Sequence, residues 1–157
     1  MAIEIERKFL VTGDGWRDQV IGQDRLKQGY LCNRENATVR VRVGGGRALL
    51  NIKSATTGIR RAEYEYEIPL QEGEELLRTM ARQPVIDKTR YRVRHGGHVW
   101  ELDVFEGANR GLVIAEVELA SEDEPFERPE WAGEEVSGDP RYYNASLIEH
   151  PYREWSQ

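Results

Sequence analysis

The chain has 157 residues, of which 39% are hydrophobic and 32% charged, and its formal net charge is -6. This length suits a single domain with a usable core, spanning residues 1–157, and the apolar fraction is too high for a disordered chain. The negative charge argues against a general nucleic-acid or membrane-surface binder, so any anion site must be a local basic cluster.

Cysteine content and the N-terminal segment narrow the class of protein further. Cys32 is the only cysteine, which excludes an intrachain disulfide and argues against a zinc–thiolate site. The first residues include Glu4 and Glu6 instead of a basic and then apolar leader, and no apolar run reaches membrane-spanning length. We therefore expect a cytoplasmic protein without a signal peptide or a membrane partner.

Alternation of apolar and polar residues with period two dominates the chain and is typical of β-strands. In chain order, it predicts strands over residues 2–11, 25–32, 38–43, 48–54, 60–70, 85–95, 98–107 and 111–120. Short helices are predicted over 14–21, 72–82 and 144–149, and an irregular segment anchored by Trp131 over 125–140. Strands joined by short turns favour an antiparallel sheet, and about eight can close on themselves. The predicted fold is mainly β (α+β): a closed eight-stranded antiparallel β-barrel, or tunnel, with a few helices packed outside.

Each predicted strand has one apolar and one charged face, and whole strands carry a single sign of charge. The basic rows are Arg40/Arg42 and Lys88/Arg90/Arg92/Arg94, and the acidic rows are Glu63/Glu65/Glu67 and Glu116/Glu118. Neighbours on one face lie roughly 6.5–7 Å apart, so like charges repel and a ligand of opposite charge relieves the repulsion. Carboxylate pairs suit a hard divalent cation, while Arg and Lys rows suit phosphate oxygens.

Two plainer explanations of the charged faces remain open. An antiparallel sheet often has one solvated, charged face. The rows could also pair with each other as a structural salt-bridge network, although buried ion pairs contribute little net stability after desolvation. A site for a metal–phosphate complex explains both signs of charge on one inner surface.

A series of motifs then identifies a family. Glu4-Ile5-Glu6-Arg7-Lys8 forms an ExExK pattern. It is followed by Gln28-Gly29-Tyr30-Leu31, Val39-Arg40-Val41-Arg42, Ile52-Lys53-Ser54, Arg61-Ala62-Glu63-Tyr64-Glu65, Lys88-Thr89-Arg90-Tyr91, Glu101-Leu102-Asp103-Val104-Phe105, Glu116-Val117-Glu118, Gly133-Glu134-Glu135-Val136 and Tyr143-Asn144. Over nearly the whole chain this set resembles the CYTH superfamily, also called the triphosphate tunnel metalloenzymes, and especially its short bacterial inorganic tripolyphosphatases. The resemblance implies an eight-stranded tunnel, a Mg²⁺ or Mn²⁺ cofactor and a small-molecule triphosphate substrate.

Carried over residue by residue, the resemblance assigns three sets of side chains. The metal ligands would be Glu4, Glu6, Glu116 and Glu118. The phosphates would bind Lys8, Arg40, Arg42, Lys53, Lys88, Arg90 and Arg92. Among the catalytic residues, Lys88 would lie near the bridging or leaving oxygen as an electrostatic stabiliser or proton donor. The others, Glu63, Glu65 and Asp103, would hold a second metal or orient the attacking water.

The expected reaction is metal-dependent hydrolysis of inorganic tripolyphosphate to pyrophosphate and phosphate. The alternatives are a class IV-type adenylate cyclase, a nucleoside or thiamine triphosphatase, and a non-catalytic polyphosphate- or nucleotide-binding module. Retention of all four predicted metal carboxylates argues against the last. We expect the few helices to leave part of the outer face that carries Tyr64 and Tyr66 uncovered, and a homodimer would cover it.

Overall fold

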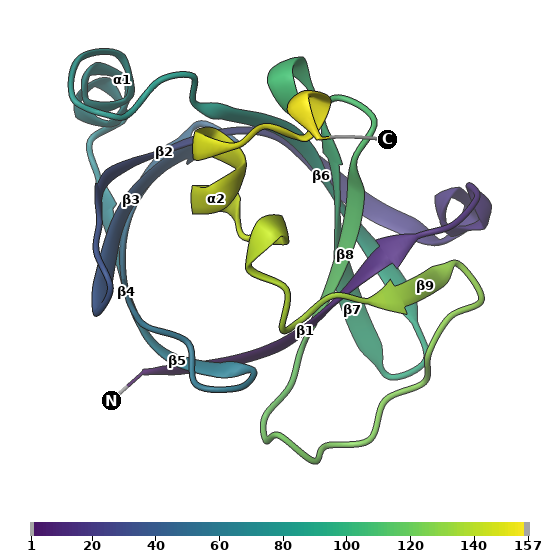
Figure 1. Cartoon of the computed structure of the whole chain (residues 1–157). Helices are drawn as coiled ribbons and strands as arrows, with labels where there is room; N and C mark the ends of the chain where they lie inside the picture. The colour runs from purple at the N-terminus through teal and green to yellow at the C-terminus, as the bar shows by residue number, and fades with distance from the viewer. Residues whose placement is uncertain (1, 156–157) are drawn as a thin grey trace.

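The computed structural model describes residues 2–155 and is dominated by one antiparallel sheet. Its order is β5-β4-β3-β2-β6-β7-β8-β1-β9, and β1 also pairs with β5, which closes the first eight strands into the ring seen in Figure 1. The strands are β1 (Ile3–Val11), β2 (Val20–Asn33), β3 (Ala37–Gly44), β4 (Arg47–Ser54), β5 (Arg60–Ile68), β6 (Ile86–His95), β7 (His98–Phe105), β8 (Val113–Glu118) and β9 (Ala132–Glu135). The predicted closed eight-stranded barrel is therefore confirmed.

Two short segments differ from the sequence prediction. The helix expected over 14–21 is only a 3-10 turn, η1 (Gly15–Gln19), because Val20 already pairs with Val93 of β6 and extends β2. The irregular segment around 125–140 contains β9, which pairs with the C-terminal part of β1, whereas β5 pairs with the N-terminal part. Its sequence, Ala-Gly-Glu-Glu, has no apolar alternation, so only its pairing partner makes it a strand.

The main apolar core lies outside the barrel wall. Outward-facing Phe9, Trp100 and Leu102 are fully buried, and Trp16 of η1 and Trp131 of the 119–131 segment cover them. The helix α1 (Leu70–Thr79) covers a second outer patch on β3 and β4. The apolar strand faces thus pack outward against these covering segments, which leaves the inner surface to the charged rows.

The C-terminal segment covers one end of the barrel. It contains η3 (Pro140–Tyr142), α2 (Asn144–Glu149) and η4 (Tyr152–Glu154). A further 3-10 turn, η2 (Gly107–Asn109), connects β7 and β8. Leu147 and Ile148 of α2 pack with Ile86, Phe105 and Ile114 of the strands. Figure 1 shows α2 within the outline of the ring, whereas α1 lies outside it as expected. The start of α2 is thereby brought to the inner surface.

Part of the outer wall has no cover in the described chain. Tyr64 and Tyr66 of β5 are 41% and 55% exposed, beside Ile52 of β4. This is the face for which the sequence predicts a homodimer, and that partner stays a prediction. None of the helices between residues 2 and 155 is long and apolar enough to cross a membrane.

Candidate active site

The barrel encloses a cavity of about 470 Å³. Strand alternation turns the charged rows toward it, so that eight acidic and eight basic side chains of the described chain form much of its wall. The acids are Glu4, Glu6, Glu35, Glu63, Glu65, Glu101, Glu116 and Glu118, and the bases are Lys8, Arg34, Arg40, Arg42, Lys53, Arg61, Lys88 and Arg90. Opposite charges from all eight barrel strands except β2 therefore converge on one enclosed space.

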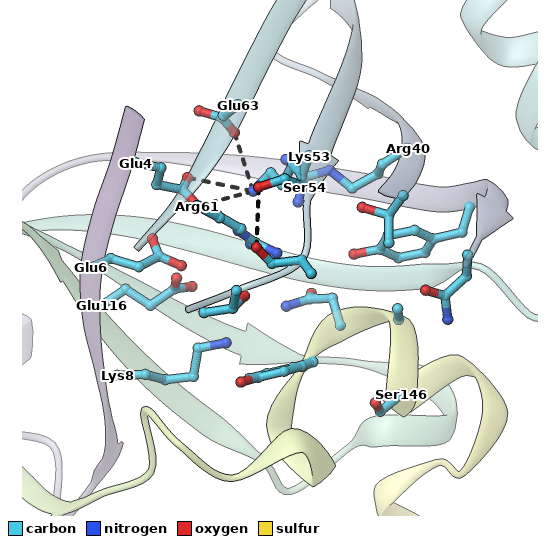
Figure 2. A pocket seen from close by; sticks show the side chains of 18 of the residues that line it. Glu4, Glu6, Lys8, Arg40, Lys53, Ser54, Arg61, Glu63, Glu116 and Ser146 are labelled. Atoms are coloured by element: carbon cyan, nitrogen blue, oxygen red, sulfur yellow. Dashed lines mark hydrogen bonds and ion pairs between the residues drawn. The ribbon is translucent and has the colours of Figure 1, made fainter. Parts of the chain in front are cut away.

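Glu4 is held by two cations, Arg61 of the adjacent strand β5 and Lys53 of β4. Its Oε1 lies 3.0 Å from Arg61 Nε and 3.4 Å from Lys53 Nζ, and Lys53 Nζ is 3.1 Å from Glu63 Oε2. Figure 2 shows these four side chains joined at one corner of the cavity. Burial alone would raise the pKa of Glu4, but attraction to Lys53 and Arg61 outweighs it and the pKa lies below its ordinary value. Glu4 is thus an ionised carboxylate whose charge is already balanced.

Glu6 lies two residues farther along β1 and faces another acid instead of a base. Its carboxyl group hydrogen-bonds to that of Glu116, and Figure 2 shows the two side chains facing each other. Burial, and then repulsion from Glu116, raises the pKa of Glu6 well above its usual range. For Glu116, attraction to Lys8 and the hydrogen bond from Glu6 overcome burial and hold the pKa well below its usual range. Two buried carboxyl groups in this arrangement disfavour ionisation of both at once, and a divalent cation between them would relieve the repulsion.

The donor set here fits a hard cation that completes its shell with other oxygens. Glu118 lies across from Glu6 in the β1–β8 register, and burial, with repulsion from Glu4, raises its pKa. No three His, Cys, Asp or Glu side chains between residues 2 and 155 form a ready-made metal cluster. Mg²⁺ characteristically binds one or two carboxylates together with waters and substrate phosphates. Glu6 and Glu116, with Glu118 nearby, supply such a partial shell.

Another part of the cavity carries excess positive charge. Arg40 is buried and its Nε has no hydrogen-bond partner in the described chain. Lys8 is also buried, with its Nζ 5.3 Å from the centre of the Tyr143 ring, and no described carboxylate lies within ion-pair distance of Lys8 or Arg40. Burial, and then repulsion from Arg40 and Arg90, lowers the pKa of Arg42. Buried cations without ion-pair contacts are suited to bind an anion with several oxygens.

Lys88 and Arg90 are arranged by a single buried carboxylate. Asp103 Oδ2 is 2.8 Å from Lys88 Nζ, and Arg90 donates to both oxygens of Asp103 at 2.8 and 2.9 Å. Burial lowers the pKa of Lys88 to about 8, although attraction to Asp103 opposes the shift. Asp103 thus holds Lys88 and Arg90 in place, and both of these bases line the cavity.

The structure brings together all but two of the residues that the sequence selected. The cavity wall includes Glu4, Glu6, Lys8, Arg40, Arg42, Lys53, Glu63, Glu65, Lys88, Arg90, Glu116 and Glu118. Arg92 does not line it: its side chain is 41% exposed and pairs with Asp24 at 2.8 Å. Asp103 does not line it either, because Lys88 and Arg90 occupy both of its oxygens. The roles that the sequence assigns to Asp103, in holding a second metal or orienting water, and to Arg92, in binding phosphate, stay predictions that these contacts do not favour.

Several wall residues were not predicted. Arg61 shares the parity of Glu63 and Glu65, so strand alternation could have identified it. Tyr143 and Asn144 come from the C-terminal segment, where only their likeness to the family's tail marked them. No periodic pattern could have placed these two against the barrel interior.

Comparison with known proteins gives a consistent result. The chain is 45% identical over 157 residues to a protein of Acetivibrio thermocellus named inorganic triphosphatase, with complete coverage of both chains. It is 40% identical over 149 residues to an inorganic triphosphatase of Nitrosomonas europaea, covering 92% of this chain and 95% of the relative. Among solved structures, the inorganic triphosphatase NE1496 superposes with a TM-score of 0.66 at 37% identity, covering 94% of this chain and 95% of that one. The CYTH domain model matches residues 2–152. The chain therefore belongs to the CYTH domain family.

Proposed function

We propose that this protein hydrolyses inorganic triphosphate to pyrophosphate and phosphate. The observation that carries the proposal is the enclosed cavity in which Arg40 and Lys8 are buried without an ion-pair contact to any described carboxylate while Glu6 and Glu116 crowd together. A compact metal–polyphosphate complex would neutralise both groups at once. The relatives at 45% and 40% identity, both named inorganic triphosphatase, support the same substrate.

The residues of the wall would act mainly by position and charge. In phosphoryl transfer the charge spreads over the phosphoryl oxygens, so positioned cations supply much of the catalysis. Lys8, Arg40, Arg42, Lys53 and Arg90 would bind phosphate oxygens, and Lys88 would stabilise the oxygen that leaves. Glu63 and Glu65 lie on the same wall and would orient the attacking water or hold a second cation.

Enzymes of this family are metal-dependent, and here Mg²⁺ or Mn²⁺ is the proposed cofactor. Glu6 and Glu116 would hold it, with Glu4 and Glu118 adding negative charge around it. When bound, the ion would polarise the phosphate and lower the pKa of bound water. Partial coordination by the protein leaves room for the oxygens of the substrate in the remaining positions.

A substrate panel tests the proposal. The purified protein is incubated with tripolyphosphate, ATP and thiamine triphosphate, with Mg²⁺, with Mn²⁺ and after chelation, and all products are identified. We expect metal-dependent release of phosphate and pyrophosphate from tripolyphosphate at the highest kcat/KM. Formation of cyclic AMP with pyrophosphate from ATP would indicate a cyclase instead. Binding of these compounds without turnover under either metal would indicate a non-catalytic module.

A further inference from the structure

Asn144, the first residue of α2, connects the C-terminal segment to the basic part of the cavity. Its Oδ1 accepts hydrogen bonds from Gln28 Nε2 at 2.7 Å and from Lys88 Nζ at 3.1 Å. Gln28 is fully buried on β2, and Lys88 is 1% exposed on β6. One side-chain oxygen therefore joins two neighbouring strands to the segment that closes the end of the barrel.

The chemistry of Lys88 fixes the orientation of the Asn144 amide. An ammonium group only donates hydrogen bonds, so the atom of Asn144 that faces Lys88 must be the oxygen. Gln28 must then present its nitrogen to the same oxygen, because two amide oxygens facing each other would repel, and Gln28 Oε1 is buried without a partner in the described chain. The Asn144 amide nitrogen is consequently turned away from both donors.

Two sets of donors are left for a ligand by this arrangement. The Lys88 ammonium has three N–H donors, and Asp103 Oδ2 and Asn144 Oδ1 occupy two of them. Asn144 Nδ2 donates to no acceptor between residues 2 and 155, and both Asn144 and Lys88 line the cavity. An anion beside Lys88 would therefore meet N–H groups from both side chains.

We propose that Asn144 is a further substrate-binding residue: its oxygen holds the Lys88 ammonium in place, and its amide nitrogen donates to a phosphate oxygen of the triphosphate. This inference rests on the proposed function for the identity of the anion. It gives the C-terminal segment a direct part in the site, in addition to covering the end of the barrel.

The test is the affinity of metal-free protein for tripolyphosphate, measured by isothermal titration calorimetry on the whole chain. Asn144→Asp keeps an oxygen for Lys88 and Gln28 but removes the donor and adds a negative charge, whereas Asn144→Ala removes both functions. We expect each substitution to raise Kd by at least about tenfold, with Asn144→Asp at least as damaging as Asn144→Ala. If the oxygen alone mattered, Asn144→Asp would bind nearly as tightly as the wild type.

Asn109 provides a matched control, because it also anchors the C-terminal segment but lies away from the cavity. It is buried, and its Oδ1 accepts a hydrogen bond from the backbone N–H of Tyr152 at 2.8 Å. Asn109→Ala should lower Tm yet leave Kd within about twofold of the wild type.

Each outcome of these measurements decides the inference. Wild-type Kd in Asn144→Asp, or equal weakening by Asn109→Ala and Asn144→Ala, would overturn it. If the wild type binds tripolyphosphate with this pattern but never hydrolyses it, the binding role stands and the proposed function fails. If the wild type binds tripolyphosphate neither without metal nor with Mg²⁺, both are wrong.

Discussion

Glu4 and Glu6 lie two residues apart on the same inward face of β1, yet their surroundings are opposite. Glu4 meets Lys53 and Arg61, and its pKa is lowered although burial opposes the shift. Glu6 meets Glu116, and burial together with that neighbour raises its pKa. The pKa values of two identical residues of one motif are therefore shifted in opposite directions, because β5 presents a base to Glu4 whereas β8 presents an acid to Glu6.

This difference assigns different functions to the two carboxylates. Glu4 compensates the charges of Lys53 and Arg61, and its removal would leave Arg61 without an ion-pair partner and Lys53 with Glu63 alone. The Glu6–Glu116 pair is instead an unfavourable arrangement in the free protein, which a bound cation would relieve. Within one strand, the protein thus places a structural ion pair beside a site suited to a ligand.

The largest expected effect comes from Glu6→Gln. Loss of the cation should reduce metal-dependent triphosphate turnover on the order of 1,000-fold, because a metal ion contributes several kcal/mol to transition-state stabilisation. Tm should stay unchanged or rise, since a crowded acid has been removed. Phosphate-release kinetics and thermal unfolding measure both, and wild-type turnover would remove Glu6 from the mechanism.

Glu4→Gln should have its main effect on folding. The substitution leaves the buried Lys53 and half-buried Arg61 cations without their shared carboxylate, so the free energy of unfolding should fall by about 3 kcal/mol. Denaturant titration measures the change. Glu67→Gln is the matched control, because Glu67 pairs with Arg47 at the exposed surface and its loss should leave the free energy of unfolding nearly unchanged. Equal effects of the two substitutions would contradict the structural function of Glu4.

The basic residues permit a parallel comparison between a buried and an exposed arginine. Arg40→Ala should weaken tripolyphosphate binding by about 10- to 100-fold, because charge-assisted hydrogen bonds to the anion are lost. Arg92→Ala should change Kd by no more than about twofold, since Arg92 pairs with Asp24 outside the cavity wall. Calorimetric titration of both variants with tripolyphosphate measures the two affinities. An equal loss of affinity would refute the assignment of Arg40, and not Arg92, to the phosphate site.

The smallest expected effect is a pH dependence from Lys88. Its pKa of about 8 means that the ammonium is charged below this pH and loses its charge as the pH rises through it. Because the charged form binds phosphate, kcat/KM should fall above about pH 8. Lys88→Arg stays charged and should lose this alkaline decline. A decline of the same midpoint in both proteins would assign it to another group.

Strand parity explains how much of the site could be predicted from the sequence. Alternation places Arg40, Lys53 and Glu116 on inward faces, and closure of the barrel then gathers them regardless of their separation along the chain. The same parity places Arg92 and Asp103 on inward-facing positions. It does not tell how far along the barrel axis a side chain lies or which residue pairs with it on the next strand. Asp103 pairs directly with Arg90 in the β6–β7 register, which buries its carboxylate.

The C-terminal contribution could not be predicted from local pattern. The helix over 144–149 is correctly placed in the sequence, but its packing against Ile86 and Phe105 depends on how the chain folds over the end of the barrel. Asn144 reaches Lys88 only through that packing. Pairing between distant segments likewise creates β9 from four residues without a strand pattern.

A crystal structure of the protein with tripolyphosphate and Mn²⁺ is the most direct test of the central claim, because anomalous scattering locates the manganese. The account predicts a manganese peak beside Glu6 and Glu116 inside the barrel. Phosphate density should lie against Arg40, Lys8 and Lys88. Manganese and phosphate bound only on the outer surface, with Glu6 and Glu116 still hydrogen-bonded to each other, would contradict it.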